Sequence, residues 1–363
     1  MNSAVPKMRW FASALLLGAS SAFGAATITV TIDTLNEPPL TGFTDPTPVA
    51  PIAGGNPGAT LGAQRLYVFQ TAANQWAKLL NSSVPILVSA KMTALTCSGS
   101  SAVLGQAGPD NAFANFPNAP KTNVFYAIAL ADSLSGTAND PGNAQIDATF
   151  NVDIDTGTCL TGSTWSYDTN GSHGVPSNKI PLLPVVFHEL GHGLGFITFT
   201  DLSTGEFIPT NGATDPPSCP CFPDIWDFYL FDQAQNKSWA AINPTGHNSS
   251  AIVNSSKNDP DLVWAGKHVN RLQRVFLDQA LSGTHNGCMR MYAPNPQEPG
   301  SSVSHWTKAS LHALLMQPYL NETIFNMVDL TLPAFQDIGW STNVEDLLFY
   351  DGFDKNPCPS VQP

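Results

Sequence analysis

The sequence predicts an α+β fold, because its hydrophobic residues follow two different periodicities. Short stretches of alternating or continuous apolar residues, bounded by turn residues, predict strands at 26–33, 85–90, 123–130 and 145–152. Two longer stretches carry apolar residues at three- and four-residue steps and predict helices at 63–80 and 180–196.

The first elements follow from local composition. Residues 26–33 read ATITVTID, a β-branched alternation that predicts a strand, and the Pro-, Gly- and Thr-rich residues 35–62 predict an irregular segment. The helix at 63–80 follows from its spaced apolar side chains: Leu66, Phe69, Ala73, Trp76 and Leu80.

The next segments are predicted to be strands and loops. Residues 85–90 and 123–130 are apolar and predict strands, whereas 98–122 predicts a loop. The alternation in 145–152 (QIDATFNV) predicts a strand at the edge of a sheet.

The helix at 180–196 has clear start and stop signals. Pro181 and Pro184 suit a first turn, and Gly193 and Gly195 suit its end. The polar, Pro- and Gly-rich region that follows, 200–300, contains two helical stretches, and a last packed helix is predicted near the end of the chain: 224–232, 269–281 and 328–340.

Length and charge limit the classes of function. The chain has 363 residues, 42% of them hydrophobic, which is enough for one large domain or two modest ones. Its net charge is −13 and it has no basic run, so we expect neither nucleic acid nor an anionic membrane as a partner.

The first 24 residues predict a signal peptide. Lys7 and Arg9 precede a short apolar run, and Ala22-Phe23-Gly24 is a small-x-small cleavage site. No later stretch is apolar enough to span a bilayer, so we expect a secreted protein, extracellular or periplasmic, without a transmembrane segment.

Six cysteines in an exported chain predict disulfides. We expect Cys97 to pair with Cys159. Cys219 and Cys221 are separated by one residue, and no second pair follows at zinc-ribbon spacing, so we expect them to form disulfides and not a structural zinc site.

Residues 188–192, His-Glu-Leu-Gly-His, carry the clearest chemical signal. Residues four apart lie on one face of a helix, so His188 and His192 can bind one metal ion. Glu189 is placed to take a proton from a metal-activated water.

The third ligand is not fixed by this motif. A compact pattern would place a histidine at position 198, but Thr198 stands there and is a poor zinc ligand. The acidic candidates that remain open are Glu206, Asp201, Asp224 and Asp227. Among the other histidines, His305 stands out because Ser304-His305-Trp306 is followed by Leu315-Met316-Gln317-Pro318.

These segments resemble the leishmanolysin family of metzincin zinc peptidases. The shared features are HELGHGLGF, the distant Ser-His-Trp and Leu-Met-x-Pro segments, and the final AFQDIGW. The resemblance implies one catalytic Zn²⁺ held by His188, His192 and His305, with Glu189 as general base. It also implies that Met316 forms the Met-turn beneath the metal and that Gly195 turns the chain away from the helix.

The resemblance further implies a metzincin-like, two-lobed peptidase. A catalytic domain at 25–340 would follow the signal peptide at 1–24 and precede a tail at 341–363. Its upper lobe, about 25–196, would hold a twisted sheet and the active-site helix. Its lower lobe, about 197–340, would be irregular and stapled by disulfides.

The expected function is therefore that of a secreted zinc-dependent endopeptidase that acts as a monomer on a protein or peptide substrate. We expect an extended substrate to pair with the edge strand near 145–152, and activity to fall below about pH 6, where histidines become protonated. The alternatives are a secreted zinc-binding module without catalysis and an adhesion module that acts through its 200–300 region.

Overall fold

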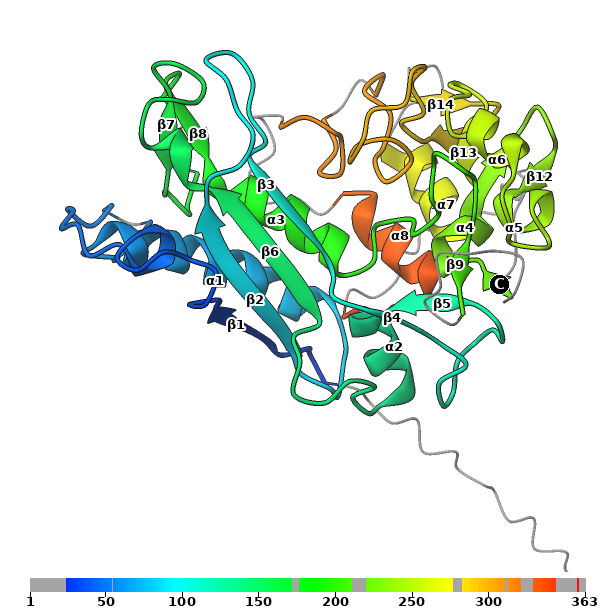
Figure 1. The fold of residues 1–363 in the computed structure, drawn as a ribbon, viewed down its shortest axis with the longest axis horizontal. Helices are drawn as coiled ribbons and strands as arrows, with labels where there is room; N and C mark the ends of the chain where they lie inside the picture. The colour runs from blue at the N-terminus through cyan, green and yellow to red at the C-terminus, as the bar shows by residue number, and fades with distance from the viewer. Residues whose placement is uncertain are drawn as a thin grey trace, which may run out of the picture.

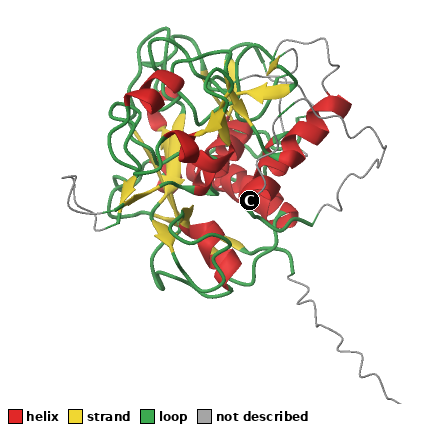
Figure 2. Cartoon of the chain, turned by 90° about the vertical axis from the view of Figure 1, so that its right-hand side faces the viewer, coloured by secondary structure: helices red, strands yellow, loops and turns green. Residues whose placement is uncertain are grey.

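The computed structural model describes residues 24–53, 55–171, 176–210, 220–276, 283–310, 313–320, 329–343 and 358. These residues form a mixed α+β structure with several small sheets, in which loops and turns make up a large share of the chain (Figure 2). Nearly all of the predicted signal peptide and most of the predicted tail lie outside the described residues.

A four-stranded sheet, with strand order β1-β2-β6-β3, organises the first half of the chain (Figure 1). Three of its strands run parallel and β3 runs antiparallel to β6 at one edge. The four strands are β1 (Ile28–Ile32), β2 (Ile86–Thr93), β6 (Ile146–Asn151) and β3 (Gly105–Pro109).

Two helices, α1 (Leu61–Leu79) and α3 (Leu182–Gly193), pack against each other and against this sheet (Figure 1). The Thr60 side chain caps α1 by accepting a hydrogen bond from the Ala63 backbone N–H. The buried indole of Trp76 in α1 donates to the Phe187 carbonyl of α3 at 3.1 Å. This bond fixes α3, which carries the HELGH motif, against the core.

The second half of the chain contains a five-stranded antiparallel sheet, with order β12-β11-β13-β15-β14. Its strands are β11 (Leu230–Asp232), β12 (Lys237–Ser238), β13 (Leu262–Trp264), β14 (Thr284–His285) and β15 (Cys288–Arg290). The helices of this half are α4 (Ile225–Tyr229), α5 (Trp239–Ile242), α6 (Ser250–Ser255), α7 (Lys267–Phe276) and α8 (Thr331–Ile338).

Shorter elements complete the described part of the chain. They are the 3₁₀ turns η1 (Gly42–Thr44) and η2 (Val152–Ile154), helix α2 (Ile128–Ser135), and the strand pairs β4 (Ala112–Ala114) with β5 (Phe125–Ala127), β7 (Thr164–Ser166) with β8 (Lys179–Pro181), and β9 (Ile208–Pro209) with β10 (Cys221–Phe222).

The structure corrects four predictions. The strand predicted at 123–130 is shorter, because β5 ends at Ala127 and α2 follows. A stretch that is apolar and buried throughout shows neither the helical nor the strand periodicity, so the sequence could not separate the two elements. The strand at 145–152 is not an edge, because β6 pairs with β2 on one side and β3 on the other. The edge is β3, whose sequence GQAGP suggested a loop. The second half is less irregular than expected, because strands of two or three residues are too short to show a period.

Two disulfides join distant parts of the chain. Cys97 pairs with Cys159, which confirms the prediction, and Cys288 pairs with Cys358. Both are consistent with an oxidising compartment. Among the helices of the described residues, none combines the length and the apolar character needed to cross a membrane.

Candidate metal centre

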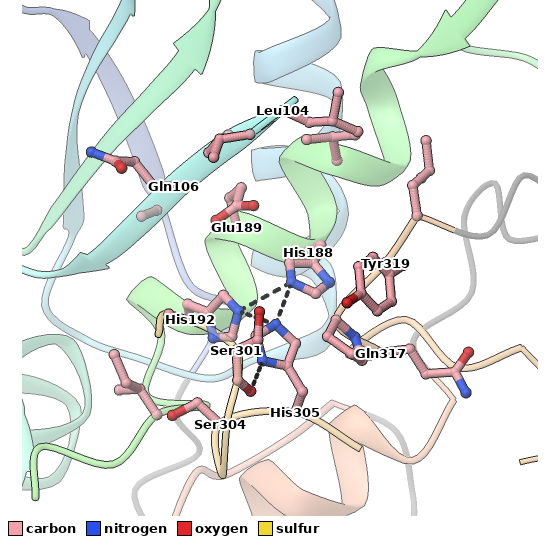
Figure 3. A pocket seen from close by; sticks show the side chains of 18 of the residues that line it. Leu104, Gln106, His188, Glu189, His192, Ser301, Ser304, His305, Gln317 and Tyr319 are labelled. Atoms are coloured by element: carbon pink, nitrogen blue, oxygen red, sulfur yellow. Dashed lines mark hydrogen bonds between the residues drawn. The ribbon is translucent and has the colours of Figure 1, made fainter. Parts of the chain in front are cut away.

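The helix α3 presents two histidines toward a cavity. Its other residues are almost all buried, including Val186, Phe187 and Leu190, so its orientation is set by the core. His188 and His192 are one turn apart and therefore lie on the same face of the helix. Figure 3 shows both imidazoles pointing to the same point in space.

The end of α3 is shaped by Gly195. This residue has φ +114°, a left-handed value that favours glycine. The Gly195 N–H donates to His192 O at 3.0 Å and the Phe196 N–H donates to Gly191 O at 3.0 Å, which is the Schellman pattern of a helix end. The turn brings the Phe196 carbonyl to His192 Nδ1, at 2.8 Å. The expected turn at Gly195 thus also orients a histidine.

His305 reaches the same point from the second half of the chain. Its backbone is held by pairing with neighbouring segments: the Tyr292 N–H donates to His305 O at 2.8 Å, and the Trp306 N–H donates to Met316 O at 2.8 Å. The His305 side chain is 3% exposed, and its Nδ1 lies 2.7 Å from Ser301 O. These contacts fix both its backbone and its ring.

Met316 lies directly beneath the helix. A Cβ added at Gly191 would meet the Met316 sulfur at 2.8 Å, so this glycine leaves room for the methionine. The preceding carbonyl, Leu315 O, lies 2.7 Å from His188 Nδ1. The turn at 314–317 therefore packs against α3 through Met316 and orients His188 through its backbone.

The three imidazoles form a regular triangle of nitrogen atoms. The Nε2–Nε2 distances are 3.1 Å for His188–His305, for His188–His192 and for His192–His305 (Figure 3). Nitrogen ligands of a tetrahedral zinc ion, at bonds of about 2.0–2.1 Å, lie about 3.3 Å apart. The triad His188, His192 and His305 therefore has the spacing of a three-histidine metal site and can hold an ion.

The hydrogen bonds at the far side of each ring fix its tautomer. Each Nδ1 faces a backbone carbonyl, which only accepts, so each Nδ1 carries the proton and each neutral Nε2 carries a lone pair. Three lone pairs then converge at 3.1 Å with no proton between them. This arrangement is repulsive by itself and becomes favourable when a cation binds.

Burial keeps these histidines neutral. Desolvation lowers the pKa of His188 to about 4 and that of His192 to about 3, the latter with a contribution from His188. Desolvation, with the two neighbouring histidines, lowers the pKa of His305 well below its ordinary value. In the metal-free chain all three histidines are thus harder to protonate than ordinary histidines.

Glu189 lies between the histidines and the edge strand β3 (Figure 3). Burial raises the pKa of its carboxyl to about 8, and a hydrogen bond from the Ala107 backbone opposes this shift. A Cβ added at Gly105 would lie 3.0 Å from Glu189 Cγ and 2.9 Å from a ring carbon of Phe150. Gly105 therefore makes the space in which Glu189 sits.

The triad and Glu189 line a cavity of about 740 Å³. One wall is the segment 102–107, which includes the start of β3, and the opposite wall is built from 299–305 and 314–320. Tyr319 is 57% exposed at this opposite wall, and its hydroxyl donates to Glu298 Oε2 at 2.8 Å. The cavity is thus lined by both halves of the chain.

The acidic alternatives for the third ligand lie elsewhere. Asp224 and Asp227 form a capping box at the start of α4, and Thr198 Oγ1 donates to Asp227 at 3.0 Å. Asp201 is bonded to Ser203 at 2.7 Å, and Glu206 contacts Cys221. Among the residues that the structure describes, only His305 joins the two histidines of α3.

Four groups around the site are not signalled by the sequence. Three are the carbonyls of Phe196, Ser301 and Leu315, which any residue type would supply, and the fourth is Gly105. The chain matches no family model, and comparisons with curated proteins and with solved structures find no match.

Proposed function

We propose that the protein is an exported zinc-dependent endopeptidase, and that its active site is formed by His188, His192, His305 and Glu189. The observation that carries the proposal is the convergence of three Nε2 lone pairs beside a buried carboxylate in an open cavity. A metal-binding module needs the three histidines but has no need for the glutamate.

The donor set suits zinc. Three neutral imidazoles are a common catalytic zinc site, and they leave one coordination position for a reactant. A zinc ion bound here would supply positive charge for a peptide carbonyl oxygen and would activate a water. The backbone carbonyls on the three Nδ1 atoms would keep the ligands in one tautomer and one orientation.

Glu189 is placed to move the protons of peptide hydrolysis. Its carboxylate would accept a proton from the attacking water and then donate it to the leaving nitrogen. Its burial by β3 favours this role, because it raises the pKa of the carboxyl toward neutral pH, where the group can both accept and donate a proton.

The edge strand β3 supports a peptide as substrate. The Asn151 N–H donates to Leu104 O, and the Asp110 N–H donates to Gln145 O. In an antiparallel ladder every second residue bonds to the partner strand, so the backbone groups of Gly105 and Ala107 point away from β6. These groups border the cavity, and because the Ala107 N–H bonds to Glu189, the N–H and C=O of Gly105 and the C=O of Ala107 remain for a substrate. An extended substrate would add to this edge by main-chain hydrogen bonds, which moves the proposed pairing from 145–152 to β3.

The resemblance to leishmanolysin-like metzincins agrees with this proposal, and we propose that the chain belongs to that family. The relevant features are the position of Met316 under α3 and the delivery of His305 from a distant segment.

The test compares the parent chain with Glu189→Gln on casein and on a fluorogenic peptide, at equal zinc content. We expect the variant to keep its zinc and to lose at least about 100-fold in hydrolysis, the lower range for removing a general base. Equal hydrolysis by the two proteins would contradict the assignment of Glu189. Zinc without hydrolysis in the parent would favour the module without catalysis.

A further inference from the structure

A second group of metal-ligating side chains lies outside the cavity, in the second half of the chain. It consists of Glu206, Cys221 and His247. Cys221 Sγ lies 3.3 Å from Glu206 Oε1 and 3.6 Å from His247 Nδ1, and all three ligand atoms lie within 4.8 Å of one another.

The two sulfur distances match those around a tetrahedral zinc ion. With a Zn–S bond of about 2.3 Å and Zn–N or Zn–O bonds of about 2.0–2.1 Å, the sulfur lies about 3.5 Å from each of the other ligand atoms. The observed sulfur distances bracket this value. One thiolate, one imidazole and one carboxylate are all zinc ligands.

The backbone holds the three ligands in place independently of any ion. Cys221 is in β10, which pairs with β9, and β9 begins two residues after Glu206. The Asn243 side-chain amide donates to Gly205 O at 3.0 Å and to His247 O at 2.7 Å, and so joins the loops that carry two of the ligands.

Gly246 allows the loop of His247 to approach Cys221. Its φ is +75°, and a Cβ added there would lie 2.2 Å from the Cys221 carbonyl oxygen. Only glycine fits this contact. The neighbouring Phe207 N–H donates to Gly246 O at 2.8 Å, which fastens the same loop to the strand after Glu206.

Charge also favours a divalent cation at this place. Cys221 is 5% exposed and Glu206 is partly buried, and the Cys221 thiol donates a hydrogen bond to the Glu206 carboxylate. A Zn²⁺ ion would take the place of that thiol proton and would be held by a thiolate and a carboxylate, whose charges it balances.

We propose that Glu206, Cys221 and His247 bind a second, structural zinc ion. The sequence predicts no zinc site here, because no second cysteine pair follows at zinc-ribbon spacing. The proposed partners are instead a glutamate 15 residues before Cys221 and a histidine 26 residues after it. The ion would clip β9 and β10 to the loop of His247. It would thereby support the adjoining residues Thr200 and Leu202, which line the cavity.

The test counts zinc in the purified full chain after dialysis. We expect two zinc ions per chain in the parent, one in Cys221→Ser and one in the double variant His188→Ala/His192→Ala. Because that double variant removes the proposed active-site metal, failure of one site is distinguishable from failure of the other. If Cys221→Ser does not fold, the partly exposed His247→Gln serves in its place, with His285→Gln as the matched control.

Cobalt substitution gives a second readout. A thiolate ligand produces a near-ultraviolet charge-transfer band, which we expect in the parent and in His188→Ala/His192→Ala but not in Cys221→Ser. The proposal is overturned if Cys221→Ser binds as much zinc as the parent, if the band is absent from the parent, or if peptide mapping of the zinc-loaded protein finds Cys221 in a disulfide.

Discussion

Binding of zinc to the triad should release close to one proton at pH 6, and that proton should come from Glu189. In the metal-free site the pKa of Glu189 is raised to about 8, so about 99% of this carboxyl is protonated at pH 6. A nearby divalent cation favours the carboxylate and expels the proton.

The histidines should contribute almost nothing to this release. With a pKa of about 4 for His188 and about 3 for His192, about 1% or less of each ring is protonated at pH 6. Three histidines with an ordinary pKa of about 6.5 would together release about 2.3 protons at the same pH. The two cases therefore differ by more than one proton.

The assay is zinc titration of the metal-free chain by calorimetry in two buffers that differ in ionisation enthalpy. The Cys221→Ser background removes any proton from that thiol. Glu189→Gln should bind zinc and release almost no proton. Release of two or more protons by the parent, or equal release by the two proteins, would show that burial does not hold the histidines neutral and Glu189 protonated.

Three further predictions concern the surroundings of the triad. Gly105→Ala should lower peptide hydrolysis at least about tenfold, or about 1.4 kcal/mol, with zinc retained, because the added Cβ would lie 3.0 Å from Glu189 Cγ. The control Gly108→Ala, whose added Cβ meets nothing within 4 Å, should leave hydrolysis unchanged, and equal losses in the two variants would contradict this prediction. In the metal-free chain, His192 stays neutral when folded down to about pH 3 but gains a proton when unfolded below about 6.5, so its contribution to stability is lost as the pH falls through this range. The free energy of unfolding, measured with urea between pH 6 and 4.5, should therefore fall less steeply with falling pH in His192→Gln than in the parent, by about 1.4 kcal/mol per pH unit. Identical pH slopes in the two proteins would contradict this prediction. Finally, N-methylation of successive residues in a cleaved peptide should slow hydrolysis with a period of two if the substrate pairs with β3, and uniform effects would exclude that pairing.

The sequence could predict the side chains of the site, but not the backbone groups around them. His188, Glu189 and His192 form a local motif on one helix turn, and their spacing is enough to place them together. His305 is 113 residues beyond His192, so only the Ser-His-Trp and Leu-Met-x-Pro segments indicated it, through a resemblance and not through periodicity.

What the sequence could not predict depends on the backbone and on three-dimensional proximity. The edge strand β3 contains Gly and Pro, which favour loops, and it forms a strand because β6 offers it a partner. In the same way, nothing in the local sequence joins Glu206 to Cys221 and His247. Their meeting depends on the pairing of β9 with β10 and on Asn243.

The three-histidine site is tested most directly by the zinc content of His305→Ala, measured in the Cys221→Ser background so that only the triad is counted. His268→Ala is the matched control, because His268 lies at the start of α7, outside the residues that line the cavity. We predict about one zinc ion per chain in the Cys221→Ser protein and in the control, and little or none in His305→Ala at the same free zinc concentration. Full zinc content in His305→Ala would show that the third ligand lies elsewhere and would contradict the site described here.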